Sequence, residues 1–253
     1  IPEQVVKKGT VTVNVIEGRL GRIKIEGIKA SLKSYVRSII HRKVDNPLKQ
    51  EELLEALQLL QLNPLFAQVD AELIEGNRKE TSLLVLDLKP TRSWLWEAEV
   101  NNTQNPDFGV IQGDVSLMNQ NLLGFGDTLR GRFRFTEGVN SSRIAYSIPF
   151  NGGQQELFFR KSDNDVSIIS DLEGLSVSSV ADTFSTGISL RLADGVSERL
   201  VLGLRLDFRD SQTFLNGEPF AFNLGTLADN GETQVRVLRL SGTYSKRGAN
   251  YTL

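Results

Sequence analysis

The chain has 253 residues, enough for two domains of roughly 150 residues each, and its formal net charge is -2. A balance this close to neutral gives no electrostatic reason to expect nucleic acid as a partner. There is no cysteine and only one histidine, His41, which excludes disulfide scaffolds, thiol catalysis and multi-histidine metal sites. The sequence contains no run of about 18 apolar residues, so a membrane-spanning helix is not predicted. This absence does not exclude a β-barrel that spans the membrane with strands.

The first third of the chain predicts a small α+β unit. Two short strands come first, and a helix follows whose N-terminus is expected to be capped by Ser31. A second helix and two further strands complete the order β-α-α-β-β, with two helices on one face of a small sheet. The expected strands are Val11–Ile16, Arg22–Glu26, Ala67–Ile74 and Ser82–Lys89, and the second helix is Gln50–Leu62. The predicted inward positions are Leu32, Val36, Ile39 and Ile40 in the first helix and Leu53, Leu54, Leu57 and Leu60 in the second.

From Thr91 onward the pattern changes to strands and turns. Several strands reach about ten residues, the length that crosses a bilayer at a tilt, against five or six in soluble sheets. Short connections alternate with long ones, Asp163–Ala181 and Ser211–Glu232, as in outer-membrane barrels. The eight predicted strands are Ser93–Asn102, Val110–Asn121, Asp127–Glu137, Ser142–Phe150, Gln155–Ser162, Thr183–Leu192, Glu198–Asp210 and Thr233–Lys246.

The predicted strands have one apolar and one polar face. The clearest case is the segment SERLVLGLRLDFRD from Ser197 to Asp210, where leucines alternate with Gly203, Arg205 and Asp207. The polar faces are rich in arginine. In a barrel these residues line a water-filled lumen, and in a soluble sandwich they form the solvated face, two readings that alternation does not separate. The predicted lumen-lining residues are Arg130, Arg132, Arg134, Arg160, Arg191, Arg205, Arg209 and Arg239.

Four stretches carry a resemblance to a known family. GTVTVNVIEGRLGRIKIEG, residues 9–27, resembles the junction between the two POTRA (polypeptide-transport-associated) modules of two-partner secretion transporters of the hemolysin secretion type. NPLKQEELLEALQLLQLNP, residues 46–64, is similar to the second of these modules. RSWLWEAEVNN and LLGFGDTLRGRF, residues 92–102 and 122–133, resemble the first strands of the family's barrel. The family belongs to the superfamily of the outer-membrane barrel-assembly insertases.

The resemblance implies a fold and an activity. The expected fold is a POTRA module followed by the first half of an antiparallel transmembrane β-barrel, because the family's barrel has about sixteen strands. The implied domains are the end of a first POTRA module (1–18), the second module (19–90) and the barrel strands (91–253). The chain is interpreted as a trimmed piece. The implied activity is export of an unfolded, β-rich passenger through the barrel of a Gram-negative outer membrane, with POTRA in the periplasm and lipid around the barrel.

The resemblance also implies where a passenger binds. A POTRA edge strand accepts an extended segment as an additional strand. The expected positions lie on the strand 67–74 and on the stripe of the neighbouring helix: Ala67, Val69, Ala71, Leu73, Leu32 and Val36. A plain structural edge is the alternative. For the whole protein the alternatives are an insertase of the same superfamily and a soluble all-β binding or adhesion domain.

An enzyme is not expected. His41 lies beside Arg42 and Lys43 and is interpreted as a surface residue. Gly124-Phe125-Gly126 lacks the third glycine of a dinucleotide loop and is interpreted as a hairpin turn. The aspartates at 163, 165 and 171 have no compact calcium-loop spacing. No cofactor, metal or nucleotide is therefore predicted.

Overall fold

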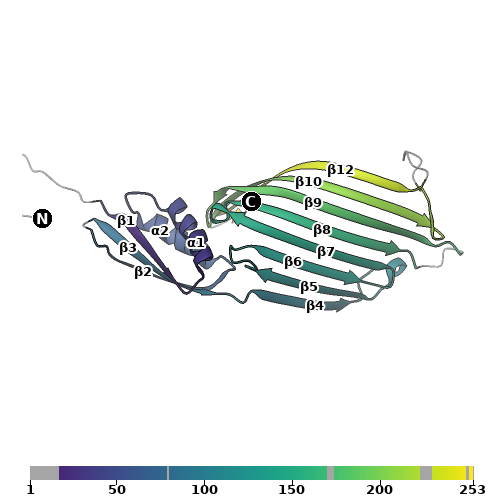
Figure 1. Cartoon of the computed structure of the whole chain (residues 1–253), viewed down its shortest axis with the longest axis horizontal. Coiled ribbons are helices and arrows are strands. Elements are labelled where there is room, and N and C mark those ends of the chain that lie inside the picture. The colour runs from purple at the N-terminus through teal and green to yellow at the C-terminus, as the bar shows by residue number, and fades with distance from the viewer. Residues whose placement is uncertain (1–16, 79, 170–173, 223–229, 249–250, 253) are drawn as a thin grey trace, which may run out of the picture.

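The protein consists of an α+β unit at one end and a broad, curved antiparallel sheet at the other (Figure 1). The structure, a computed structural model, describes residues 17–78, 80–169, 174–222, 230–248 and 251–252. The predicted strand Val11–Ile16 and nearly all of the segment 1–18 lie outside the described residues. Among the described helices, none is long and apolar enough to cross a membrane.

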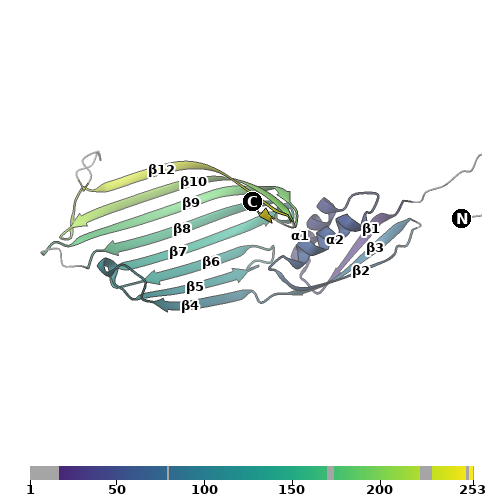
Figure 2. The ribbon, with the colours of Figure 1, turned by 180° about the vertical axis from the view of Figure 1, so that it is seen from behind.

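The α+β unit has the predicted element order. Strand β3 lies at the centre of its sheet, parallel to β1 and antiparallel to β2, in the order β1-β3-β2. The two helices cover one face of this sheet (Figure 2). The elements are β1 (Arg19–Glu26), α1 (Ala30–Lys43), α2 (Gln50–Gln61), β2 (Phe66–Glu75) and β3 (Thr81–Pro90).

The core of this unit lies between the helices and β3. All four predicted inward residues of α1 are buried, together with the alternating leucines of β3. In α2 the prediction was wrong for Leu54, which is 49% exposed, whereas Ala56 is fully buried. The reason is the helical period: Leu53, Ala56 and Leu60 recur at i, i+3 and i+7, and Leu54 is turned about 100° away from that stripe. The buried leucines of β3 are Leu84, Leu86 and Leu88.

Ser31 does not cap α1. The N-cap residue is Lys29, which makes no side-chain capping bond. The Ser31 hydroxyl instead donates a hydrogen bond of 2.7 Å to the carbonyl oxygen of Gly124, in the turn that follows β5. A residue type that usually caps a helix thus connects the α+β unit to the large sheet.

The large sheet contains the eight predicted strands and two strands of two residues each. The strand order is β13-β12-β10-β9-β8-β7-β6-β5-β4, with β11 paired to β10. Among the described residues β4 has β5 as its only neighbour, so the sheet is open along β4. The strands are β4 (Trp94–Asn101), β5 (Gln112–Gln120), β6 (Thr128–Phe135), β7 (Val139–Phe150), β8 (Gln155–Ser167), β9 (Val177–Asp194), β10 (Glu198–Leu215), β11 (Glu218–Pro219), β12 (Glu232–Gly248) and β13 (Tyr251–Thr252).

The strands lengthen across the sheet, from 8 residues in β4 to 18 in β9 and β10. The loops after β8 and β10 are shorter in the structure than predicted, because the strands that flank them are longer. Strand β8 ends at Ser167, β9 starts at Val177 and β10 ends at Leu215. These extensions are rich in Ser and Asp, so they lack a regular apolar alternation. Backbone pairing between neighbouring strands holds them without an apolar face, and sequence periodicity therefore misses them.

Candidate functional site

The large sheet has an apolar face and an arginine face, as the alternation along each strand predicts. On β10 the side chains of Leu202, Leu204, Leu206 and Phe208 lie on the apolar face and are 39 to 44% exposed. The apolar face continues on β12, where Leu240 is 82% exposed. A contiguous exposed apolar surface of this kind is typical of a face that contacts lipid or another protein.

The arginine face carries every predicted lumen-lining residue. The strand register places all eight on this one face, because neighbours in register point the same way. For example, Arg205 pairs with Arg239, and Asp207 pairs with Ser185, which in turn pairs with Arg160. The eight arginines therefore share one face of the sheet, and their place in a lumen stays a prediction.

Two aspartates of this face, Asp114 and Asp207, form ion pairs with four of these arginines, and only Asp207 was predicted to lie here. Asp114 on β5 is 5% exposed and accepts two hydrogen bonds from Arg132, of 2.7 and 2.9 Å, and one of 3.1 Å from Arg134. A two-point contact of this type fixes the guanidinium plane as well as its charge. Asp207 on β10 likewise forms ion pairs with two arginines, Arg205 at 3.1 Å and Arg239 at 2.7 Å.

The same face contains further arginines that the prediction missed, among them Arg143 on β7 and Arg199 on β10. Arg143 lies directly opposite Arg132 on the neighbouring strand and donates a hydrogen bond of 3.3 Å to Ser162. Its strand was predicted to begin at Ser142, one residue earlier, so the alternation around it was short. The complete register, in which β7 begins at Val139, places Arg143 on the arginine face.

The turn between β5 and β6, part of the stretch LLGFGDTLRGRF, is built around a buried aspartate. The carboxylate of Asp127, fully buried, accepts hydrogen bonds from the backbone N–H groups of Leu123 and Phe125 and from the Tyr146 hydroxyl at 2.9 Å. Gly124 has a φ of 97°, a conformation that favours glycine. The turn thereby presents the Gly124 carbonyl to Ser31 of α1, so this motif positions the α+β unit.

A second connection between the two parts is made by Arg42, near the end of α1. One terminal nitrogen donates to the carbonyl oxygen of Asn151 at 2.9 Å, in the turn between β7 and β8. The other forms an ion pair of 3.1 Å with Asp194 at the end of β9. Both side chains of this pair are about four-fifths shielded from solvent. One arginine thus joins α1 to two turns of the sheet.

The β7–β8 turn packs directly against α1. Gly152 has a φ of 61°, and a Cβ atom there would lie 3.0 Å from the backbone nitrogen of Ile39. Gly153 has a φ of 81°, its carbonyl accepts a hydrogen bond of 2.6 Å from Arg191, and a Cβ would lie 3.0 Å from the Tyr35 hydroxyl. The two adjacent glycines therefore permit a close approach that other residues would prevent.

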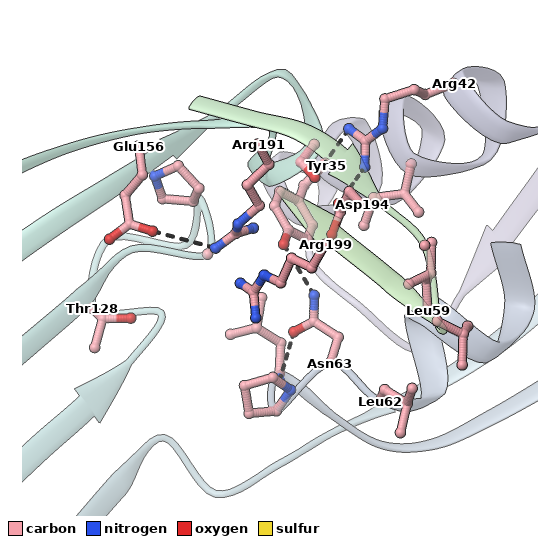
Figure 3. A pocket seen from close by; sticks show the side chains of 18 of the residues that line it. Tyr35, Arg42, Leu59, Leu62, Asn63, Thr128, Glu156, Arg191, Asp194 and Arg199 are labelled. Atoms are coloured by element: carbon pink, nitrogen blue, oxygen red, sulfur yellow. Dashed lines mark hydrogen bonds and ion pairs between the residues drawn. The ribbon is translucent and has the colours of Figure 1, made fainter. Parts of the chain in front are cut away.

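A cavity of about 550 Å³ lies at this junction (Figure 3). Helix α1 contributes Tyr35 and Arg42 to its wall, and β9 contributes Arg191 and Asp194. Asn63 donates a hydrogen bond of 3.0 Å to the Tyr35 hydroxyl, and burial raises the pKa of Tyr35 above its ordinary value. The phenol therefore stays neutral at physiological pH, and the cavity wall combines it with arginine and carboxylate groups.

Strand β2 is one of the two edge strands of the small sheet, since β3 is its only neighbour among the described residues. Of the predicted passenger-binding positions, Ala67, Ala71 and Leu73 are exposed and Val69 packs partly against the core. The prediction was wrong for the helix stripe, because Leu32 and Val36 are 2% and 0% exposed and belong to the core. Apolar periodicity marks burial, and here the helix buries its stripe against β3. The accessible candidate surface is thus the β2 edge alone.

Comparison with known proteins gives matches at the level of structure. No protein-family model and no curated protein matches the sequence. Among solved structures, CdiB from Escherichia coli aligns over 94% of this chain and 44% of its own, with a TM-score of 0.71 and 17% identity. CdiB from Acinetobacter baumannii aligns over 93% of this chain and 44% of its own, with a TM-score of 0.68 and 17% identity. The chain has the CdiB fold.

The CdiB fold extends to a second protein. BamA from Haemophilus ducreyi lacking POTRA domains 1-3 aligns over 92% of this chain and 45% of its own, with a TM-score of 0.61 and 14% identity. The chain thus spans less than half the length of each of these three structures. The shared fold agrees with the family that the four sequence stretches resemble.

Proposed function

We propose that this chain is part of an outer-membrane protein transporter of the two-partner secretion type. The observation that carries the proposal is the CdiB fold, which covers the α+β unit and the large sheet together over 94% of the chain. CdiB and BamA are outer-membrane β-barrel proteins, and CdiB belongs to two-partner secretion. The exposed apolar face supports a barrel wall that contacts lipid, and the arginine face supports a water-filled lumen. A soluble adhesion domain requires neither of these faces.

In this proposal the α+β unit is a POTRA module in the periplasm. Its β2 edge binds an unfolded, β-rich passenger by adding a strand, with backbone hydrogen bonds supplying affinity. The free edge and the exposure of Ala67, Ala71 and Leu73 support this role. The passenger then passes along the arginine face, without nucleotide hydrolysis. The proposed protein is not an enzyme.

The first test is membrane fractionation of the full-length protein that contains this chain. We expect it to fractionate with outer membranes and to require detergent to stay dispersed. A soluble, detergent-independent protein would mean that the apolar face is buried against another sheet and would end the transport proposal.

The second test concerns the β2 edge. Proline at Val69 and Leu73 removes two backbone donors from the edge strand. We expect this double substitution to abolish passenger binding while the module stays folded. A matched control is proline at an exposed position of the adjacent turn, Asn77, which is not in the strand. Unchanged binding in the strand variant would refute the role of this edge.

An insertase that folds other barrel proteins is the second candidate, because BamA shares the fold with a TM-score of 0.61. The two functions predict different substrates. A transporter releases its passenger outside the cell, whereas an insertase leaves its substrate in the membrane. Depletion of the protein followed by analysis of both fractions distinguishes them: loss of integral barrel proteins would favour the insertase.

A further inference from the structure

Three neighbouring arginines of the arginine face lack a carboxylate partner. Among the described residues, no Asp or Glu oxygen lies within 4.0 Å of Arg130, Arg143 or Arg160. Arg130 donates to the sulfur of Met118 at 3.3 Å, and Arg143 donates to the Ser162 hydroxyl. These are neutral and weak acceptors, in contrast to the carboxylates that hold the arginines on either side.

The strand register brings these three arginines around one small residue. Ala145 on β7 pairs with Arg130 on β6 and with Arg160 on β8, so the three lie in one row across the sheet. Arg143 is two residues from Ala145 on the same strand and therefore shares its face. A hollow of about 710 Å³ lies here, and the small side chain of Ala145 forms part of its wall. The four basic residues lining it are Arg130, Arg132, Arg143 and Arg160.

The charges that line this hollow are unbalanced. Among the described residues, Glu97 is the one acidic residue in its wall, against four arginines. Arg132 is already engaged by Asp114, and Arg160 lies over the ring of Phe158, 5.8 Å from its centre. Like charges on adjacent positions of a sheet destabilise one another. A bound carboxylate would relieve this repulsion and would accept hydrogen bonds from guanidinium groups that have no charged partner.

We infer that this hollow binds acidic side chains of an extended polypeptide segment. The inference rests on the proposed transport function and refines it: the arginine face selects segments that carry Asp or Glu, and the polypeptide in transit is the occupant. Charge complementarity supports this occupant over a basic or neutral one. The hollow is open toward the same side as the other arginines, so a chain moving along this face meets it.

The test measures peptide binding to the full-length protein in detergent micelles. The probe is a fluorescent peptide of alternating Ser and Glu, compared with Ser–Gln and Ser–Lys peptides of equal length. Wild type should bind the Glu peptide most tightly, with an affinity that falls as salt rises. The double variant Arg143→Gln/Arg160→Gln should weaken Glu-peptide binding by about five- to tenfold, as expected for the loss of two partly exposed ion pairs.

Two further variants separate the site from general charge effects. Ala145→Phe fills the hollow without removing charge and should also weaken Glu-peptide binding. Arg236→Gln, which removes an arginine from the apolar face where it pairs with Asp210, should leave it unchanged. Equal binding of the Glu and Gln peptides to wild type, or full binding by both hollow variants, would overturn the inference.

Measuring passenger export by cells that carry the wild type or the hollow variants separates this inference from the proposed function. Normal export by wild type, together with unchanged Glu-peptide binding by the hollow variants, would overturn the site and leave the transport proposal standing. A wild type that exports nothing but prefers the Glu peptide through these arginines would overturn transport and retain the site.

Discussion

Substituting Gly152 by alanine should loosen the contact between the α+β unit and the large sheet. The φ of 61° at this position costs an L-residue about 1–2 kcal/mol. The added Cβ would lie 3.0 Å from the Ile39 nitrogen and 3.0 Å from the Ser38 Cβ, and crowding of a packed contact costs about 1–3 kcal/mol more. The total is about 2–5 kcal/mol, and the crowding is relieved only if α1 moves away from the turn.

The matched control is Gly217→Ala. Gly217 has a φ of 83° and open space where its Cβ would be placed, so this variant carries the backbone cost alone. The difference of about 1–3 kcal/mol corresponds to about a 5- to 150-fold shift away from the docked arrangement.

The absence of native cysteine makes a distance measurement direct. Spin labels at Arg37→Cys on α1 and Ser197→Cys in the β9–β10 turn report the separation of the two parts by electron paramagnetic resonance. We expect a broad, longer distance distribution for Gly152→Ala and a narrow one for wild type and for Gly217→Ala. Identical distributions in the two alanine variants would refute the docking role of the β7–β8 turn.

Three further substitutions test the core, the faces and the junction. Leu86→Ala, at a fully buried position, should lower the free energy of unfolding of the α+β unit by about 2–5 kcal/mol, measured as faster amide hydrogen exchange in β3; unchanged exchange would contradict its place in the core. Leu204→Lys on the apolar face should cost about 2–4 kcal/mol at the bilayer centre and reduce folded protein in outer membranes, whereas Arg205→Gln beside it should not; equal losses would contradict the face assignment. Arg42→Met and Asp194→Asn should each weaken docking by about 1–2 kcal/mol, measured with the same spin labels, and the double variant should lose less than the sum; additive losses would show that the pair is uncoupled.

Local patterns predicted most of the fold. The β-α-α-β-β order and the eight longer strands follow from periods of 3.6 and 2 residues and from turn residues, which act over short stretches of chain. The common face of the arginines follows from the same alternation. This prediction is reliable because the alternation within one strand defines its two faces without information on the neighbouring strands.

What the sequence did not predict depends on contacts between distant segments. Ser31 and Gly124 are 93 residues apart, so a helix-capping residue type could not be distinguished from a tether. The pairing of Arg132 with Asp114 needs the strand register, which alternation within one strand does not supply. The burial of Val36 was visible as a stripe, but the stripe does not say whether it faces a core or a partner.

Because the strands of the large sheet differ in length, their ends form an oblique border. At about 3.3 Å per residue, the 18 residues of β10 extend about 60 Å, whereas an outer-membrane apolar band is about 25 Å tall. On β10 the alternating leucines end at Phe208, and Asp210 aligns with Asp182 and Asp163 on the neighbouring strands. If lipid ends at this row of aspartates, the rest of the β9–β10 pair stands clear of the membrane on the side away from the α+β unit. In the proposed orientation, this part of the sheet would be accessible to a binding protein such as an antibody that does not contact lipid.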